Sequence, residues 1–338
     1  MASTNIDTTI KRVEMDGFPF PLGVYPVETM SPKPGHTVDF EPADGGGAAS
    51  DWEEWPDRYM YDIVTPANRL RSLCRALFSL LPMRVYPILD LLGEDIYREV
   101  DPYIAYDPTP FDRFIELVHK HQDWLYEDGL VGFGAMSEDP FLYIYIDEHK
   151  IVTVRVNAAM REQIERIIDA FDIPQTESLQ GADAAAHEHR SVLSSAPEGI
   201  TEEEILEELI ESWRLQLNVD RDSNVDDVGK ELGITSWRCL IRLAQSHNDP
   251  PVYAQVWLRA SSLVEAERLA IDAATESAQT PLDSDAAGAL VVIADRISQE
   301  TLLEALAGAQ LPSIEDDDNV VGVLAVRLVT DAQPPPGS

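Results

Sequence analysis

Two stretches of regularly spaced apolar residues, separated by a stretch without such spacing, constrain the fold of this 338-residue chain most strongly. In residues 58–174 and again in 200–331, apolar residues recur with the periods of strands and helices. Residues 175–199 between them are rich in Ala, Ser, Gly, Glu and His and carry no pattern, which is typical of a linker. The chain is long enough to bury two cores, so we expect two α+β domains.

The first domain, residues 58–174, is expected to mix helices and strands. Thr-Pro pairs at 65–66 and 109–110 indicate two helix starts, because proline at the first helical position gives up no needed donor. The apolar spacing predicts strands at 61–64, 130–133, 141–146 and 151–156, and helices from 66 to 81, from 110 to about 128 and from 160 to 171.

The second domain, residues 200–331, begins with Thr201 and Glu204, which have the spacing of a capping box at the start of a helix that runs to 217. Strands are then predicted at 237–243, 252–258, 289–293 and 320–329, with helices from about 262 to 274 and from 298 to 307. This order suits a sheet covered by helices. The fold class is therefore α+β, with two small α/β-sandwich-like domains, each a mainly antiparallel or mixed sheet.

The two ends of the chain are expected to be disordered tails. Six prolines between residues 19 and 42 and a run of three glycines interrupt any periodicity in residues 1–57, and three prolines fall in the tail at 332–338. The N-terminus lacks a basic and then apolar signal pattern, and no apolar run has the length that a membrane span needs. The cytoplasm is thus the expected location, with no membrane association.

The chain is strongly acidic. Asp and Glu total 61 against 25 Lys and Arg, a formal net charge of −36. Such a field repels phosphate backbones, so nucleic acid is an unlikely partner, whereas basic proteins and cations are favoured. Solubility, adaptation to salt and partner choice all remain open as reasons for the acidity. The two cysteines, Cys74 and Cys239, are expected in separate cores and not in a disulfide.

An acidic stretch from 220 to 231 carries the sharpest local pattern. Oxygen-bearing side chains fall at its first, third, fifth, seventh and twelfth positions: Asp220, Asp222, Asn224, Asp226 and Glu231. This spacing resembles the calcium loop of the EF-hand family, and the resemblance implies a Ca²⁺ site. Two positions depart from the family pattern, with Val225 in place of the turn glycine and Asp227 in place of an aliphatic residue. A solvated acidic loop is the alternative.

The same region also resembles the helix-turn-helix family, because Asn224 could cap a short helix and Gly233 could make the turn. Residues 237–245 would then be the recognition helix. Their apolar side chains recur at every second position from Trp237 to Leu243, with Arg238 and Arg242 between them, and this period favours a strand instead. We therefore keep only the short helix at Asn224, and DNA binding is disfavoured by the missing basic face.

The histidines are few, and none of them is expected to form a good metal-binding set. His119 and His121 are expected on different faces of one helix, and His149 sits in a hairpin turn beside two carboxylates. His187 and His189 lie in the linker, where they could bind a metal loosely but lack a rigid frame.

No catalytic motif is present, and Gly132-Phe133-Gly134 lacks the following helix that a dinucleotide site needs. Enzymatic activity stays open, but a non-catalytic role is favoured. We expect an acidic binding or regulatory protein that acts through protein–protein contacts. A calcium-binding protein or an enzyme whose site is not visible in the sequence are the alternatives.

Overall fold

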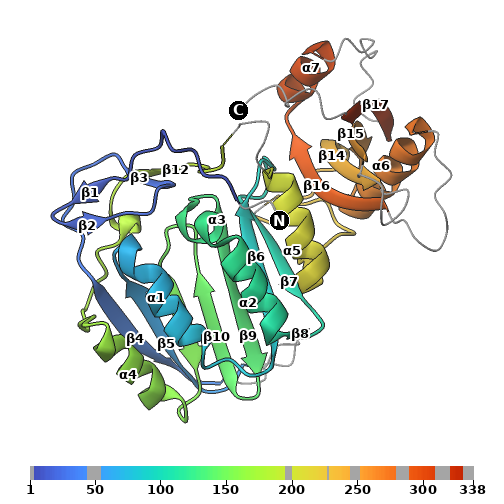
Figure 1. The fold of residues 1–338 in the computed structure, drawn as a ribbon. Helices are drawn as coiled ribbons and strands as arrows, with labels where there is room; N and C mark the ends of the chain where they lie inside the picture. The colour runs from blue at the N-terminus through green and yellow to red at the C-terminus, as the bar shows by residue number, and fades with distance from the viewer. Residues whose placement is uncertain are drawn as a thin grey trace. The chain divides into compact units, whose positions relative to one another are not determined.

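The computed structural model describes residues 4–43, 55–194, 200–226, 228–243, 252–278, 289–308 and 320–329. The protein is a mixed α+β structure with antiparallel sheets (Figure 1). Contacts between Cα atoms divide the chain into two compact units: unit 1 holds residues 1–92 and 101–218, and unit 2 holds residues 93–100 and 219–338. Within the described ranges, no helix is both long and apolar enough to cross a bilayer.

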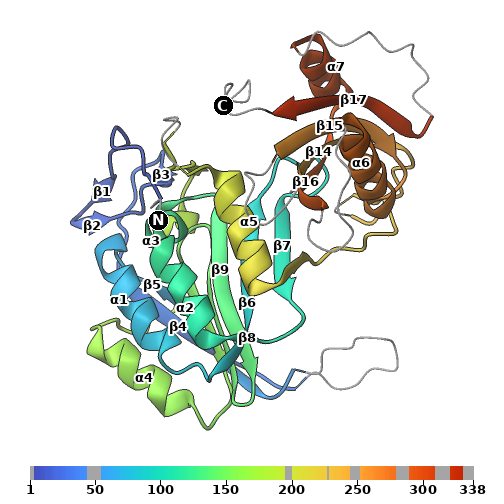
Figure 2. The same ribbon diagram turned by 45° about the vertical axis from the view of Figure 1, so that its right-hand side comes forward.

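Unit 1 is built on a sheet with the strand order β13-β7-β6-β9-β10-β11-β5-β4, and β8 pairs with β6. Its strands are β4 (Gly35–Glu41), β5 (Arg58–Val64), β6 (Arg84–Leu92), β7 (Val100–Ala105), β8 (Thr109–Pro110), β9 (Val131–Glu138), β10 (Phe141–Ile146), β11 (Val152–Val156) and β13 (Leu215–Leu217). Figures 1 and 2 show the helices along one face: α1 (Ala67–Phe78), α2 (Phe111–Lys120), α3 (Gln122–Glu127), α4 (Arg161–Ala170) and α5 (Glu202–Trp213).

The core of unit 1 lies between this sheet and these helices. The ring of Phe114 meets that of Phe78 at 5.3 Å and that of Trp213 at 5.1 Å, and all three side chains are buried. The predicted capping box of Thr201 and Glu204 is confirmed at the start of α5. Because Trp213 fills this core, α5 belongs to unit 1 and not, as expected, to the second domain.

The N-terminal segment differs from the flexible tail expected for residues 1–57. Among its described residues are β1 (Glu14–Met15), β2 (Phe18–Pro19), β3 (Val24–Pro26) and β4. Phe20 and Val24 are buried, and Arg12 forms a bidentate ion pair with Glu127, both distances being 2.9 Å. Contacts with residues about a hundred positions away order this segment, which its own composition could not indicate.

Residues 175–194 are likewise structured, although a linker was expected at 175–199. They contain the short helix η1 (Ala182–Ala184) and β12 (His187–His189), which pairs antiparallel with β3. Val192 is fully buried, and its amide donates to Asp128 at 2.8 Å. This stretch is part of unit 1, and the chain passes into unit 2 after residue 218.

Unit 2 is an antiparallel sheet in the order β16-β14-β15-β17, with α6 (Leu263–Ser277) packed against all four strands. The strands are β14 (Thr235–Leu243), β15 (Val252–Ala260), β16 (Ala289–Ile297) and β17 (Gly322–Val329), and α7 (Gln299–Gly308) follows β16. The predicted strands at 237–243 and 252–258 are confirmed. The recognition helix of the helix-turn-helix interpretation is therefore wrong, since the alternating side chains of β14 bury one face of a sheet.

Several other predicted elements are confirmed, among them strands β10 and β11 and helices α1 and α4. The single helix expected from residue 110 is instead two, which meet at the buried His121. Strands β6 and β7 were not predicted. The short helix expected at Asn224 is absent from the described residues, which form turns and an isolated bridge between Val225 and Glu231. The predicted C-terminal tail lies outside the described residues.

Candidate metal centre

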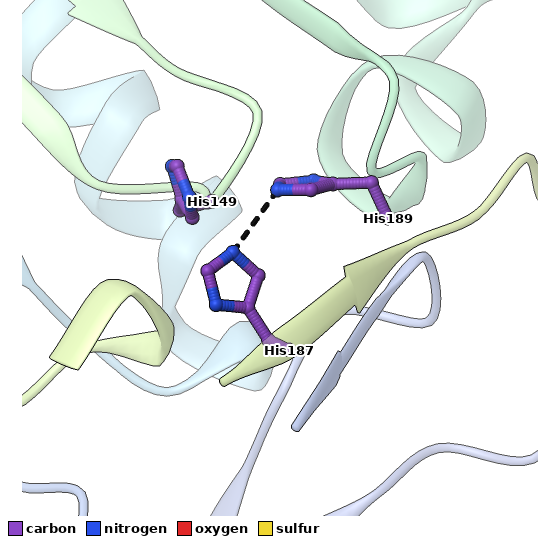
Figure 3. A group of neighbouring side chains, drawn as sticks. All are labelled: His149, His187 and His189. Carbon is purple, nitrogen blue, oxygen red and sulfur yellow. Dashed lines mark hydrogen bonds between the residues drawn. The ribbon is translucent and has the colours of Figure 1, made fainter. Parts of the chain in front are cut away.

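Two histidines of β12, His187 and His189, come together in unit 1 with His149, which lies far from them in the sequence (Figure 3). Their ring centroids are 4.8, 4.8 and 4.9 Å apart, and each pair meets edge to face. The candidate ligand atoms all lie within 4.8 Å of one another. Imidazole nitrogens at this spacing can bind one transition-metal ion together.

His187 and His189 project from the same side of β12, because side chains two residues apart in a strand share a face. The Nδ1 atom of His187 lies 2.8 Å from the carbonyl oxygen of Ala185, and Nδ1 of His189 lies 2.7 Å from that of Gly129. A carbonyl oxygen can only accept a hydrogen bond, so both Nδ1 atoms carry the proton. In the neutral rings both Nε2 atoms are then bare acceptors.

These two Nε2 atoms face each other at 3.1 Å. Two bare lone pairs at this distance repel each other, and a proton or a metal ion between them would remove that repulsion. Two nitrogens bound to tetrahedral zinc at 2.0–2.1 Å stand roughly 3.3–3.4 Å apart. The observed distance is thus close to that of a metal-bound pair.

His149 is presented by the hairpin between β10 and β11. Its Nδ1 lies 3.4 Å from a carboxylate oxygen of Asp147 and 3.2 Å from one of Glu148, which leaves Nε2 as its free nitrogen. Burial by itself would lower the pKa of His149, but the hydrogen bond to Asp147 and the nearby carboxylate charges outweigh it and raise the pKa. A carboxylate on the outer nitrogen of a metal-binding histidine is a common arrangement, because it orients the ring.

The hairpin itself is held by several hydrogen bonds. Lys150, with a left-handed backbone at φ 65°, lies beneath it with a buried side chain, and its Nζ donates to the carbonyl of Val131. The amide of Ile151 donates to the side chain of Asp147 at 2.7 Å. The amide of Lys150 donates to the backbone carbonyl of Asp147 at 3.1 Å. The position of His149 is therefore determined by the main sheet of unit 1.

The other two histidines are held by an interlocked piece of backbone. The amide of Arg190 donates to the carbonyl of Gly23 at 2.8 Å, and the amide of Gly129 donates to that of Arg190 at 3.1 Å. Gly23 and Gly129 touch so closely that a Cβ on either would collide with the other's backbone. The N-terminal segment thus supplies the rigid frame that sequence reasoning did not find for His187 and His189.

The cluster also favours a metal over a shared proton between the two facing nitrogens. Burial lowers the pKa of His189, and the neighbouring His149 and His187 lower it further, although the bond to Gly129 acts against them. A histidine with a lowered pKa holds a proton poorly at neutral pH. A divalent cation between the two Nε2 atoms would satisfy both of them without a proton on His189.

The predicted calcium ligands lie in unit 2, and the side-chain oxygens of Asp220, Asn224 and Asp226 accept hydrogen bonds within the protein. The carboxylate of Asp220 accepts from the amide of Asp222 and the hydroxyl of Ser223, and that of Asp226 accepts from the amide of Lys230. Asn224 is buried and holds Arg296 through its side-chain oxygen at 3.2 Å.

Among the described residues, the carboxylates of this stretch do not gather as a group of three or more ligand atoms. Asp227 lies outside them. Calcium binding by Asp220, Asp222, Asn224, Asp226 and Glu231 stays a prediction.

The remaining histidine pair does not converge. His121 is fully buried between the Thr4 hydroxyl and Glu208, whereas His119 on α2 is exposed. In the sequence, the only signal for the histidine cluster was the spacing of His187 and His189, which places them on the same face of a strand. Their meeting with His149 depends on contacts that no local pattern carries.

Comparison with known proteins gave no relationship: no protein-family model, no curated protein and no solved structure matches this chain. Any functional assignment must therefore be based on the geometry alone.

Proposed function

We propose that this protein binds one divalent transition-metal ion, with zinc preferred, through Nε2 of His149, His187 and His189. The observation that carries the proposal is the 3.1 Å approach of the Nε2 atoms of His187 and His189 while both Nδ1 atoms are bonded to carbonyl oxygens. Imidazole nitrogen is a ligand for zinc, copper, nickel and iron, whereas calcium and magnesium prefer oxygen.

The surrounding charge supports the same assignment. Asp147, Glu148 and Asp183 all act electrostatically on His149, so the cluster lies in a negative local field. Such a field attracts a cation and partly compensates its charge once it is bound. The overall charge of −36 adds to this attraction at low ionic strength.

The test is zinc titration of the purified full chain in competition with a chromophoric chelator, which suppresses weak binding to surface carboxylates. We expect one tight site. His187→Ala and His189→Ala should each weaken it by at least about 100-fold, since the loss of an outer partner alone costs 10–100-fold. His119→Ala, which removes an exposed histidine on α2, is the matched control. Equal zinc affinity in all three variants would refute the proposal.

Metal binding is compatible with the protein–protein role expected from the sequence, which stays a separate proposal. A basic partner is its favoured form because of the net charge. Capture of partners from extract with and without zinc, using the wild type and His187→Ala, tests both ideas together.

A calcium titration of Glu231→Gln against the wild type tests the oxygen site of unit 2.

A further inference from the structure

The carboxylates of Asp147 and Glu148 lie next to the histidine cluster, beside Nδ1 of His149, the nitrogen that is not offered to the metal. Asp147 and Glu148 form their own group with His149, but neither belongs to the group made by the three histidines. Within the described residues, the histidine nitrogens are thus the whole ligand set on the inner side. We infer that the bound metal keeps a fourth coordination position, filled by exchangeable water and open to small monodentate ligands; this rests on the proposed function.

The number of protein ligands is the first observation that supports an open coordination position. Structural zinc sites are closed by four protein ligands, whereas sites that act on a ligand have three and leave the fourth to water or substrate. The two carboxylates that could have closed the site are instead used to orient His149, at 3.4 and 3.2 Å from its Nδ1. The metal is therefore a Lewis acid with a replaceable ligand.

Access supports the same conclusion. All three histidines are partly exposed, and the side chain of His149 keeps 18% of its surface accessible. The backbone around them is nevertheless fixed by the hairpin and by the Gly23–Gly129 contact. A rigid ligand set that remains accessible to solvent can exchange its fourth ligand without unfolding.

The local charge selects the kind of ligand. Asp147, Glu148 and Asp183 surround His149 with negative charge, which opposes an approaching anion and leaves a neutral donor unaffected. The ligand class is therefore water and small neutral nitrogen or oxygen donors, in preference to anions of the same size. A substrate that uses this position would be uncharged or cationic at the group that meets the metal.

The experiment uses the full chain loaded with cobalt(II), whose visible bands report the coordination sphere. We expect both imidazole, a neutral probe, and azide, an anionic one, to shift the bands in a saturable way. The exposed Asp183 is then replaced: Asp183→Asn should raise the azide affinity about three- to tenfold and leave that of imidazole unchanged. Asp169→Asn, an exposed carboxylate on α4, is the matched control and should change neither.

The outcomes separate this inference from the proposed function. Cobalt that binds in a manner dependent on His187 and His189, but whose bands move with neither probe, would show a closed site and overturn the inference alone. Cobalt binding that is independent of these histidines would overturn the proposed function as well. Equal azide affinity in the wild type and Asp183→Asn would overturn the charge selection.

Discussion

Removal of the Asp95 carboxylate should destabilise unit 2 far more than an ordinary surface change. Its side chain is completely buried and accepts from the backbone amide of Arg296 at 2.9 Å, from Nε at 2.9 Å and from the amide of Tyr97 at 2.9 Å. The Arg296 guanidinium, 6% exposed, also donates to Asn224 and to the carbonyl of Val225. This pair anchors residues 93–100 to unit 2.

The expected magnitude follows from the charge that stays behind. Asp95→Ala leaves the Arg296 guanidinium buried without its counter-charge, which costs about 3–5 kcal/mol. Replacement of both partners, Asp95→Ala with Arg296→Met, removes the unpaired charge and should recover most of that loss. Glu267→Ala is the control, because its partner Arg221 is exposed and such pairs contribute about 0–1 kcal/mol.

The assay is urea unfolding followed by tryptophan fluorescence, with hydrogen exchange of β14 and β16 to assign the loss to unit 2. Trp237 lies in β14 and its ring is 5.7 Å from the Arg296 guanidinium, so its emission reports this region. The reasoning would be refuted if Asp95→Ala cost no more than Glu267→Ala. It would also fail if the double replacement were as unstable as the single one.

Three further predictions concern unit 1 and the buried thiols. Glu127→Ala removes the carboxylate that holds Arg12, so limited proteolysis should cut the N-terminal segment faster than in the wild type, by about tenfold or more. Gly129→Ala should weaken zinc binding at least about tenfold while the tryptophan emission of the folded chain stays native, because its Cβ meets the backbone of Gly23. Burial raises the pKa of Cys74 and Cys239 above the ordinary value of 9.0, so only the unfolded chain ionises its thiols as the pH rises through 9. Each thiol therefore stabilises the fold fully below pH 9 and should lose about 1.4 kcal/mol of this stabilisation per pH unit above it. The two thiols together give a slope of about 2.7 kcal/mol per pH unit, which Cys74→Ala should halve in urea titrations.

Elements whose signals are local could be predicted from the sequence. The alternation in 237–243 carries both its strand assignment and its buried face, and it correctly outweighed the helix-turn-helix resemblance. The capping box of Thr201 and Glu204 is likewise formed by residues three positions apart. In contrast, His121, at which α2 ends and α3 begins, is hydrogen-bonded to Thr4 and Glu208, which lie far away in the chain.

The flexible tail expected at 1–57 and the missing frame expected around His187 and His189 are both corrected by the same long-range contacts. Proline-rich composition correctly excludes long helices from residues 1–57, but it says nothing about short strands that pair with distant partners. Once β3 pairs with β12, the Gly23–Gly129 contact fixes the loop whose carbonyl orients His189. His187 and His189, which share a face of β12, are then held in place, and the hairpin between β10 and β11 places His149 next to them. A histidine cluster assembled this way is visible in sequence only as one His-x-His pair and a distant histidine, because its geometry depends on the strand pairing and not on any one segment.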